Sequence, residues 1–268
     1  MNFSILVRIS VSIGILVGLA TPVQAMKIFN LNVFDQQQGV WEPSFREQRL
    51  KAIQDFLMGE KPEVVVLQEA QKSFEPQFLR FSHEKYVHEM TGADQLSYGY
   101  WMGSAQKPQS WSEDGFSFPG GVERRVQVAI FTLKTKSKVD QCLGVLSVHL
   151  SYQSSEVRQK EANWLLEWLK RKELACKRWL VVGDFNADQA DPEMKILFAG
   201  GLKNLVTEVQ PTVTPHNPIR KIYGDKPARA IDWALGWNLN AKARVVLAQP
   251  WKGVWVSDHA GLMVEIEE

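Results

Sequence analysis

The sequence has no excess of positive charge. Its 31 lysines and arginines are balanced by 30 aspartates and glutamates, for a formal net charge of +1. Proteins that bind a nucleic-acid backbone through counterion release usually carry a basic excess or a basic stripe. The composition therefore gives no support to strong, non-specific binding of nucleic acid, although it does not exclude such binding.

The chain also lacks internal repeats, low-complexity tracts and a linker rich in proline or serine. Hydrophobic residues make up 45% of the sequence, which is ample for a large core at this length. We therefore expect one large domain, or two tightly merged halves, over residues 26–268.

The apolar run near the N-terminus, Ile9 to Ala20, is short for a membrane span. It contains no acid or base, it follows Arg8, and Val23-Gln24-Ala25 offers small residues at the positions that a signal peptidase reads. We predict a secretory signal peptide over residues 1–25 and a secreted or periplasmic mature protein. An uncleaved N-terminal anchor, or a translation start at Met26, is the alternative.

Cysteine is scarce, with Cys142 and Cys176 as the two in the chain. Their spacing resembles no zinc site. Each lies just ahead of an apolar run that is typical of a strand, and parallel neighbouring strands would place both cysteines at the same end of a sheet. A disulfide would then form in an oxidising compartment. Two separate buried thiols are the alternative.

Strand-like and helix-like patterns alternate along the mature chain, which predicts an α/β fold. Apolar residues at helical spacing predict helices over 45–58 and 157–168. The segment 88–125, rich in Gly, Ser and aromatic residues, is a functional loop, a region with short strands, or both. Apolar runs and alternation predict the strands, at 26–34, 64–67, 143–150, 179–182, 230–236 and 261–266.

Polar side chains close or interrupt these strands, where they are costly unless paired or used. In extended chain, Asp184 and Asn186 would present a carboxylate and an amide on one face. Each polar residue alone also fits a turn or a satisfied core position, but the set together indicates a site. Its members are Asn32, Glu69, His149, Asp184, Asn186, Asp232, Asp258 and His259.

The residue types in this set indicate metal-assisted chemistry on a phosphate. A magnesium-like ion binds a few carboxylate or amide oxygens and keeps positions open for water and a phosphate oxygen. Asn32, Glu69 and Asp258 offer such oxygens. Histidines near the ion are able to hold a phosphoryl oxygen, take a proton from water or stabilise developing charge. Asp232 is suited to orient one of the imidazoles.

The same residues, in this order, resemble the endonuclease/exonuclease/phosphatase superfamily, which includes deoxyribonuclease-type nucleases, apurinic endonucleases, inositol polyphosphate phosphatases and neutral sphingomyelinases. The resemblance spans nearly the whole mature chain. A departure is Val148, where the family commonly has threonine; it lies on the opposite strand face from His149, so we expect little effect. The motifs are Phe29-Asn30-Leu31-Asn32, Leu67-Gln68-Glu69, Val148-His149-Leu150, Gly183-Asp184-Phe185-Asn186, Ile231-Asp232 and Ser257-Asp258-His259.

The resemblance implies a four-layer α/β sandwich, in which two mixed β-sheets pack face to face and helices flank them. It also implies a catalytic Mg²⁺, or Mn²⁺ or another divalent cation, bound by Asn32 and Glu69 with Asp258 nearby.

Catalytic roles follow from the same resemblance. His149 and Asn186 would contact the scissile phosphate, and Asp184 would orient or deprotonate the attacking water. His259, paired with Asp232, would act as general base or stabilise the transition state. The sequence leaves open whether Asp184 or His259 is the base.

The substrate is expected to be a phosphodiester, either a phospholipid or a nucleic acid. The stretch Lys27–Arg80 looks most like neutral sphingomyelinases. Trp251 and Trp255 lie just ahead of Asp258, where indole rings would be able to rest in a membrane interface, ordinary packing being the alternative. We expect a secreted phosphodiesterase of the sphingomyelinase type without an obligate protein partner. The alternatives are a secreted or periplasmic nuclease and a non-catalytic binding protein.

Overall fold

The fold is described from a computed structural model of the 268-residue chain. The structure describes residues 25–34, 43–71, 81–88, 98–116, 124–133, 140–224 and 226–267. The predicted signal peptide, residues 1–25, lies outside these ranges except for Ala25.

The first of two six-stranded sheets has the strand order β11-β12-β1-β2-β4-β3. Strand β1 pairs with β2 in parallel and with β12 in antiparallel orientation, so the sheet is mixed. The strands are β1 (Met26–Asn32), β2 (Val64–Gln71), β3 (His83–His88), β4 (Tyr98–Ser104), β11 (Ala241–Val246) and β12 (Gly261–Ile266).

The second sheet has the order β5-β6-β7-β8-β10-β9. It is mixed as well, because β7 and β8 run parallel whereas β10 is antiparallel to β8. The strands are β5 (Ser110–Phe116), β6 (Arg124–Leu133), β7 (Gln141–His149), β8 (Trp179–Asp184), β9 (Lys203–Asn204) and β10 (Asp232–Trp237).

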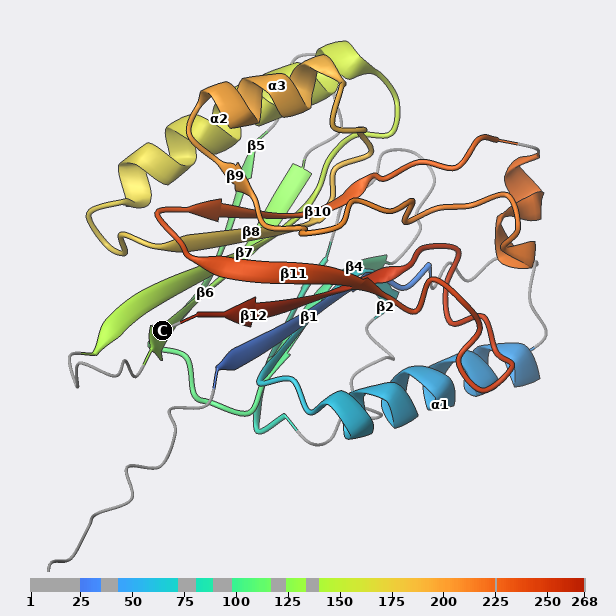
Figure 1. The fold of residues 1–268 in the computed structure, drawn as a ribbon. Helices are drawn as coiled ribbons and strands as arrows, with labels where there is room; N and C mark the ends of the chain where they lie inside the picture. Colours follow the sequence, from blue (N-terminus) through green and yellow to red (C-terminus); the bar gives the residue numbers. More distant parts are fainter. Residues whose placement is uncertain are drawn as a thin grey trace, which may run out of the picture.

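Helices cover the outer faces of the two sheets (Figure 1). Helix α1 (Pro43–Glu60) lies on the first sheet, and α2 (Ser155–Lys172) and α3 (Pro192–Ala199) lie on the second. A short 3₁₀ helix, η2 (Pro218–Tyr223), follows β9. The order helix, sheet, sheet, helix confirms the predicted four-layer α/β sandwich. Among the described helices, none combines the length and apolar content needed to cross a membrane.

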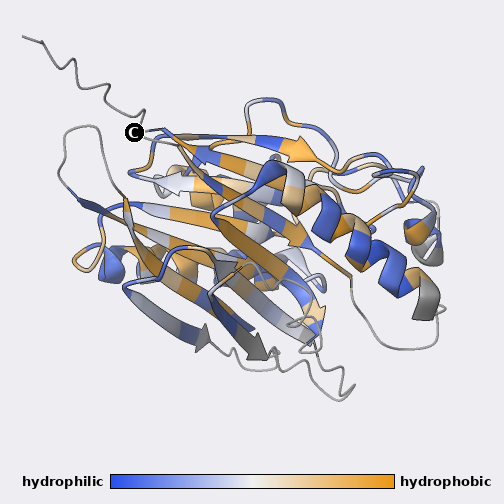
Figure 2. Ribbon diagram, turned by 90° about the horizontal axis from the view of Figure 1, so that it is seen from below, coloured by the Kyte–Doolittle hydropathy of each residue, from blue (hydrophilic) through white to orange (hydrophobic). Residues whose placement is uncertain are grey.

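Burial explains the apolar runs at the start of two central strands, residues 64–67 in β2 and 179–182 in β8. All residues of β2 and β8 are buried, because sheet or helix covers each of their faces. Hydrophobic colouring covers much of the strands inside the molecule, whereas the long helix α1 mixes hydrophilic and hydrophobic residues (Figure 2). The larger core cluster fills the space between the sheets and under α2 and α3, and a smaller one lies between the first sheet and α1.

The predicted elements are found, with shifted ends. The first strand stops at Asn32 rather than at residue 34, because the backbone turns at Phe34, where φ is 45°. The strand predicted over 230–236 begins at Asp232. The segment 88–125 is not simply a loop: it contains β4, β5 and the start of β6, whose mixed small, polar and aromatic residues hide the strand pattern.

The two cysteines form a disulfide, with their Cα atoms 5.6 Å apart. Cys142 lies at the start of β7 and Cys176 lies just ahead of β8, and these strands run parallel. Both sulfurs are therefore at one end of the second sheet, as the pattern of strands predicted. The alternative of two separate thiols is wrong.

A candidate metal-assisted catalytic site between the sheets

The predicted site residues meet at one edge of the sandwich, between the two sheets. In the second sheet, Asp184 is the register partner of both His149 and Asp232, so these three residues lie side by side on adjacent strands. In the first sheet, Asn32 and Glu69 lie at the ends of the parallel strands β1 and β2. Asp258 and His259 precede β12, and all of these side chains except that of Asn186 are buried.

The close approach of β7 and β8 at this edge depends on Gly183. Its φ is 152°, and a Cβ atom at this position would lie 1.9 Å from the carbonyl oxygen of Val148. No side chain fits there without moving the backbone of β7. The glycine in the Gly183-Asp184 motif thus permits the close pairing of β7 and β8 in which Asp184 lies beside His149.

Two site residues have left-handed backbone conformations that side chains rarely adopt. Glu69 has φ of 52° and lies where the pairing of β2 with β4 shifts register, between Leu67 and Ala70. Asn186 has φ of 50° just after β8. Such conformations cost about 1–3 kcal/mol and concentrate at functional sites. Strand β8 ends at Asp184, and Asn186 lies beyond it in a left-handed conformation, so the prediction that extended chain places these two side chains on one face is wrong.

Asn32 connects the two sheets through its amide group. Its Nδ2 donates to Glu69 Oε1 at 2.9 Å and to Asp184 Oδ2 at 3.1 Å. Its Oδ1 accepts from the backbone N–H of Phe34 at 3.0 Å. The amide nitrogen, not the oxygen, therefore faces the carboxylates, and ligation of an ion through Oδ1 requires the amide to rotate.

The oxygen Oδ2 of Asp184 is the centre of the cluster. Besides the Asn32 amide, the Nε2 atoms of His149 and His259 lie 3.7 and 3.8 Å from it. The other oxygen, Oδ1, accepts from the backbone N–H of Asn186 at 2.8 Å. Asn186 is anchored in turn by donation from Nδ2 to the Leu150 carbonyl, at 3.0 Å. The carboxylate is held so that one oxygen remains directed at both imidazoles.

His259 is oriented by Asp232. Its Nδ1 lies 2.8 Å from Asp232 Oδ2, and this contact directs Nε2 toward Asp184 and toward Asp258, whose Oδ2 is 3.9 Å away. The backbone N–H of Asp232 donates to Thr212 Oγ1 at 3.2 Å, which fixes the start of β10. The predicted pairing of His259 with Asp232 is present in the structure.

The surroundings shift the pKa values of three groups in the cluster. Burial raises the pKa of Glu69 above its ordinary value, and His149 partly offsets this effect. Burial, together with the charge of Asp232, raises the pKa of Asp184. Burial alone would lower the pKa of His259, but the charges of Asp232, Asp258 and Asp184 outweigh it and raise the pKa well above its ordinary value. The charge on each of these groups therefore affects the pKa of its neighbours in the cluster.

A family model described as the Endonuclease/Exonuclease/phosphatase family matches residues 29–259, a range that includes every predicted site residue. The chain belongs to this family. The match confirms the resemblance found in the sequence motifs. Members of the family are phosphoric ester hydrolases, and this chain is a hydrolase of the family. No curated protein matches the sequence.

Solved structures of the same fold come from proteins with different names. Sphingomyelinase C from Streptomyces griseocarneus is 16% identical, with a TM-score of 0.70 over 91% of this chain and 99% of that chain. The mannosyl-6-phosphatase Bt3783 of Bacteroides thetaiotaomicron is 16% identical, with a TM-score of 0.68 over 91% and 100%. The human Nocturnin catalytic domain is 15% identical, with a TM-score of 0.67 over 91% and 94%. At these identities, the similarity concerns the fold alone.

The donor set of this endonuclease/exonuclease/phosphatase family protein suits a divalent cation. Ligand atoms of Glu69, His149 and Asp184 lie within 4.8 Å of one another, as do those of Asp184, Asp232 and His259. The carboxylates of Glu69, Asp184, Asp232 and Asp258 concentrate negative charge in a buried space. The carboxylate oxygens suit hard ions such as Mg²⁺, Mn²⁺ or Ca²⁺, whereas the imidazole nitrogen in each group also suits an ion such as Zn²⁺.

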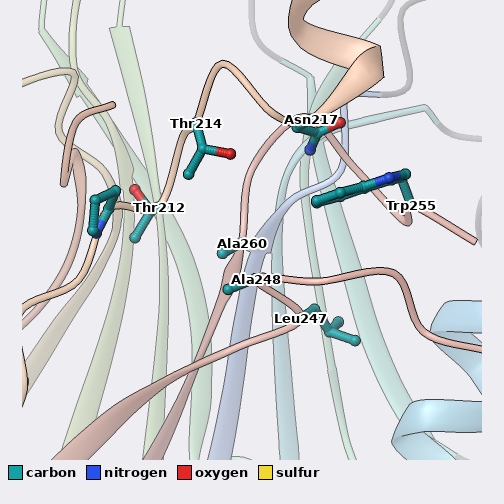
Figure 3. A pocket seen from close by; sticks show the side chains of 8 residues that line it. Thr212, Thr214, Asn217, Leu247, Ala248, Trp255 and Ala260 are labelled. Atoms are coloured by element: carbon teal, nitrogen blue, oxygen red, sulfur yellow. The ribbon is translucent and has the colours of Figure 1, made fainter. Parts of the chain in front are cut away.

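A small pocket lies between η2 and the loop that follows β11 (Figure 3). No residue of the cluster lines it, although the lining residue Thr212 also accepts a hydrogen bond from the Asp232 backbone. Figure 3 shows Trp255 and Asn217 on one side of the pocket and Thr212 on the other. Even with its opening to solvent included, the pocket holds about 190 Å³, which is below the range of about 300–1,000 Å³ that is usual for ligand sites. The lining residues are Pro211, Thr212, Thr214, Asn217, Leu247, Ala248, Trp255 and Ala260.

Several residues that support the cluster were not predicted from the sequence. Thr212 fixes Asp232, and Ser257 Oγ donates to the Asn32 carbonyl at 2.6 Å. Arg220 Nη1 lies 3.7 Å from Asp258 Oδ2. Thr212 and Arg220 lie outside the strand-end motifs, so their spacing gave no signal. Ser257 belongs to the Ser257-Asp258-His259 motif, but nothing in the sequence distinguishes its hydroxyl.

Proposed function

We propose that this protein is a Mg²⁺-dependent phosphodiesterase. The observation that carries the proposal is the Asp184 carboxylate, which faces two imidazole Nε2 atoms inside a cluster of further carboxylates. A family member with this donor set is equipped to hold a cation and to hydrolyse a phosphoric ester. The cluster retains acid–base groups as well as candidate ligands, which argues against a non-catalytic binding protein.

Glu69 and Asp258 would hold the Mg²⁺ through carboxylate oxygens, with Asn32 joining them if its amide rotates. A bound Mg²⁺ supplies Lewis-acid polarisation of a phosphoryl oxygen. His149 lies within 3.9 Å of Glu69 and is placed to contact another phosphoryl oxygen. Asn186 lies beside it, since its side chain bonds to the carbonyl of the residue that follows His149.

Asp184 and His259 form the acid–base pair of the proposed reaction. Asp184 Oδ2 and His259 Nε2 are 3.8 Å apart, so one water or phosphoryl oxygen is able to contact both. We assign proton acceptance from water to Asp184, whose Oδ2 is directed into the cluster. We assign contact with the phosphoryl oxygen to His259, since Asp232 holds its imidazole with Nε2 facing inward.

A phospholipid is the substrate class that we propose for this site, with hydrolysis of the sphingomyelinase or phospholipase C type. The balanced charge does not favour a nucleic-acid backbone, and the predicted signal peptide suits a secreted or periplasmic enzyme. Trp251 packs edge-on against Phe56 with ring centroids 5.2 Å apart, so only part of its ring is available to a membrane. Trp255 is likewise partly exposed. Transient membrane contact through these two side chains is part of this proposal.

Parallel substrate assays test the proposal. Purified protein comprising residues 26–268 is incubated in the presence of Mg²⁺ with one substrate at a time. The substrates are sphingomyelin vesicles, a DNA oligonucleotide, an RNA oligonucleotide and bis(p-nitrophenyl) phosphate. We expect release of phosphocholine and turnover of the generic diester. Cleavage of an oligonucleotide without phosphocholine release would favour a nuclease and contradict the lipid assignment. Turnover of no phosphodiester would overturn the proposed activity.

A further inference from the structure

The 3₁₀ helix η2 is fixed to the backbone that precedes Asp258. Asn217 caps this helix, because its Oδ1 accepts from the backbone N–H of Ile219 at 3.0 Å. The Nδ2 of the same side chain donates to the Ser257 carbonyl at 2.7 Å. Asn217, Ile219 and Ser257 are all buried. A side chain on η2 therefore has a defined position relative to Asp258 and His259.

Arg220 is the η2 residue whose charge reaches the cluster. Its Nη1 lies 3.7 Å from Asp258 Oδ2, and its side chain is only 11% exposed. This separation is an ion pair but is longer than a hydrogen bond. The neighbouring residue, Lys221, carries the same charge but is exposed. The helix thus directs the Arg220 side chain toward the cluster and leaves the Lys221 side chain in solvent.

A positively charged side chain such as Arg220 is unusual beside a candidate metal site. A divalent ion at Asp258 would be repelled by Arg220, so the arginine does not serve metal binding. A phosphate ester that entered the cluster would be an anion facing the carboxylates of Asp184 and Asp232, whose ligand atoms lie within 4.8 Å of each other. A guanidinium group offers several N–H donors in one plane, which match two oxygens of a phosphate. The charge of Arg220 therefore offsets repulsion of the substrate.

We propose that Arg220 binds the phosphate group of the substrate beside Asp258. This role rests on the proposed function, because it assigns a contact for the same phosphoric ester. An ion pair that merely stabilises the fold is the competing explanation. The two explanations predict different effects on Mg²⁺ binding. Loss of a phosphate-binding arginine weakens phosphate binding and leaves Mg²⁺ binding unchanged or tighter, whereas loss of a structural tie weakens both.

The test compares Arg220→Gln, Arg220→Lys and the control Lys221→Gln, which makes the same charge change at the exposed neighbour. Binding of inorganic phosphate to the Mg²⁺-loaded protein is measured by titration calorimetry. For Arg220→Gln we expect an increase in Kd of about ten- to a hundredfold, the usual effect of removing a charged hydrogen-bond partner. Arg220→Lys should recover part of the loss, and Lys221→Gln should bind as the wild type does. The KM for bis(p-nitrophenyl) phosphate should rise in parallel.

Mg²⁺ binding, followed by the thermal shift of each variant, gives a readout independent of turnover. An unchanged Kd for phosphate in Arg220→Gln would overturn the proposal, and so would parallel weakening of phosphate and Mg²⁺ binding. If Arg220→Gln does not fold, the comparison of Arg220→Lys with wild type decides: phosphate binding identical to wild type would count against a geometric role for the guanidinium. Absence of diester turnover in the wild type would refute the proposed function, while the phosphate titration would still test Arg220.

Discussion

At the scale of single residues, the account depends on Asp184 and on the atoms around its carboxylate. One oxygen is held by the Asn186 backbone, and the other faces Asn32, His149 and His259. A carboxylate with one oxygen anchored and the other directed at two imidazoles needs no rearrangement before it accepts a proton in the proposed reaction. Asn32, His149 and His259 are buried, and Asp232 holds His259 by a hydrogen bond, which keeps this geometry fixed.

Replacement of this carboxylate should abolish most activity and leave the fold intact. For Asp184→Asn we expect kcat to fall by about a hundredfold to ten-thousandfold, the range typical of a lost acid–base group. His259→Ala should give a loss of similar size. Asp140→Asn is the matched control, because Asp140 is exposed ahead of β7, at the end opposite His149. Steady-state kinetics and circular dichroism check the expectation. Near-normal kcat in Asp184→Asn would remove this residue from the proposed mechanism.

At the scale of elements, the loop after His149 is held by a buried polar network between α2 and α3. Glu193 of α3 pairs with Arg158 of α2 and accepts from Ser155 Oγ at 2.7 Å. Arg158 also donates from Nη1 to the Ser151 carbonyl at 3.0 Å. Burial alone would raise the pKa of Glu193, but the bonds from Ser155 and Arg158 outweigh it and lower the pKa. The network links the two helices to the loop that follows β7.

This network gives the stability of the protein a defined pH dependence. Because the pKa of Glu193 is lowered in the folded state, its contribution is complete above the ordinary carboxyl pKa of about 4.3 and is lost as the pH falls through the folded value. Glu193→Gln should lower the unfolding free energy at pH 7 by about 2–4 kcal/mol, since it leaves Arg158 buried without its charge partner. The loss should shrink in acid.

Urea unfolding at pH 7 and below pH 4 checks this expectation. Glu156→Gln is the control, because that carboxylate pairs with Lys160 while 80% exposed and should show little change. A loss for Glu193→Gln that is the same at both pH values would contradict the assignment of the charged pair.

The elements also show why the sequence predicted much of the fold and site but not all. A strand such as Trp179–Asp184 gives two independent signals in the sequence, an apolar run and a polar residue at its end, and such strands are predicted correctly. Strand β5 is partly exposed and mixes serine, acids and aromatics, so it has no clear period. Arg220 acts at the site through a short 3₁₀ helix, and its approach to Asp258 depends on tertiary packing that no local pattern encodes.

At the scale of the whole molecule, the candidate catalytic cluster and the disulfide lie at opposite ends of the second sheet. The disulfide joins Cys142 and Cys176 at one end of β7 and β8, whereas His149 and Asp184 lie at the other end of these strands. The cross-link closes a segment with a sequence separation of 34 residues that includes α2. Stability and catalysis should therefore respond differently to its removal.

Reduction of the disulfide should lower the unfolding free energy by about 4 kcal/mol, the value that chain entropy gives for a loop of this length. The double variant Cys142→Ala with Cys176→Ala should show a similar loss. Turnover at 25 °C should change little, because the site lies at the far end of the strands. Chemical denaturation with and without dithiothreitol, beside initial rates, checks both parts. A large loss of kcat in a folded double variant would show that the two ends are coupled.

The measurement that tests the central claim most directly is the Mg²⁺ dependence of diester hydrolysis in the wild type and in Glu69→Gln. Hydrolysis of bis(p-nitrophenyl) phosphate is followed after treatment with EDTA and during titration with Mg²⁺. We predict that EDTA removes activity and that Mg²⁺ restores it. We also predict that the Mg²⁺ concentration for half-maximal rate is at least about tenfold higher in Glu69→Gln, because a carboxylate ligand has lost its charge. Full activity in EDTA, or the same Mg²⁺ midpoint in both proteins, would contradict a metal-assisted site built on Glu69.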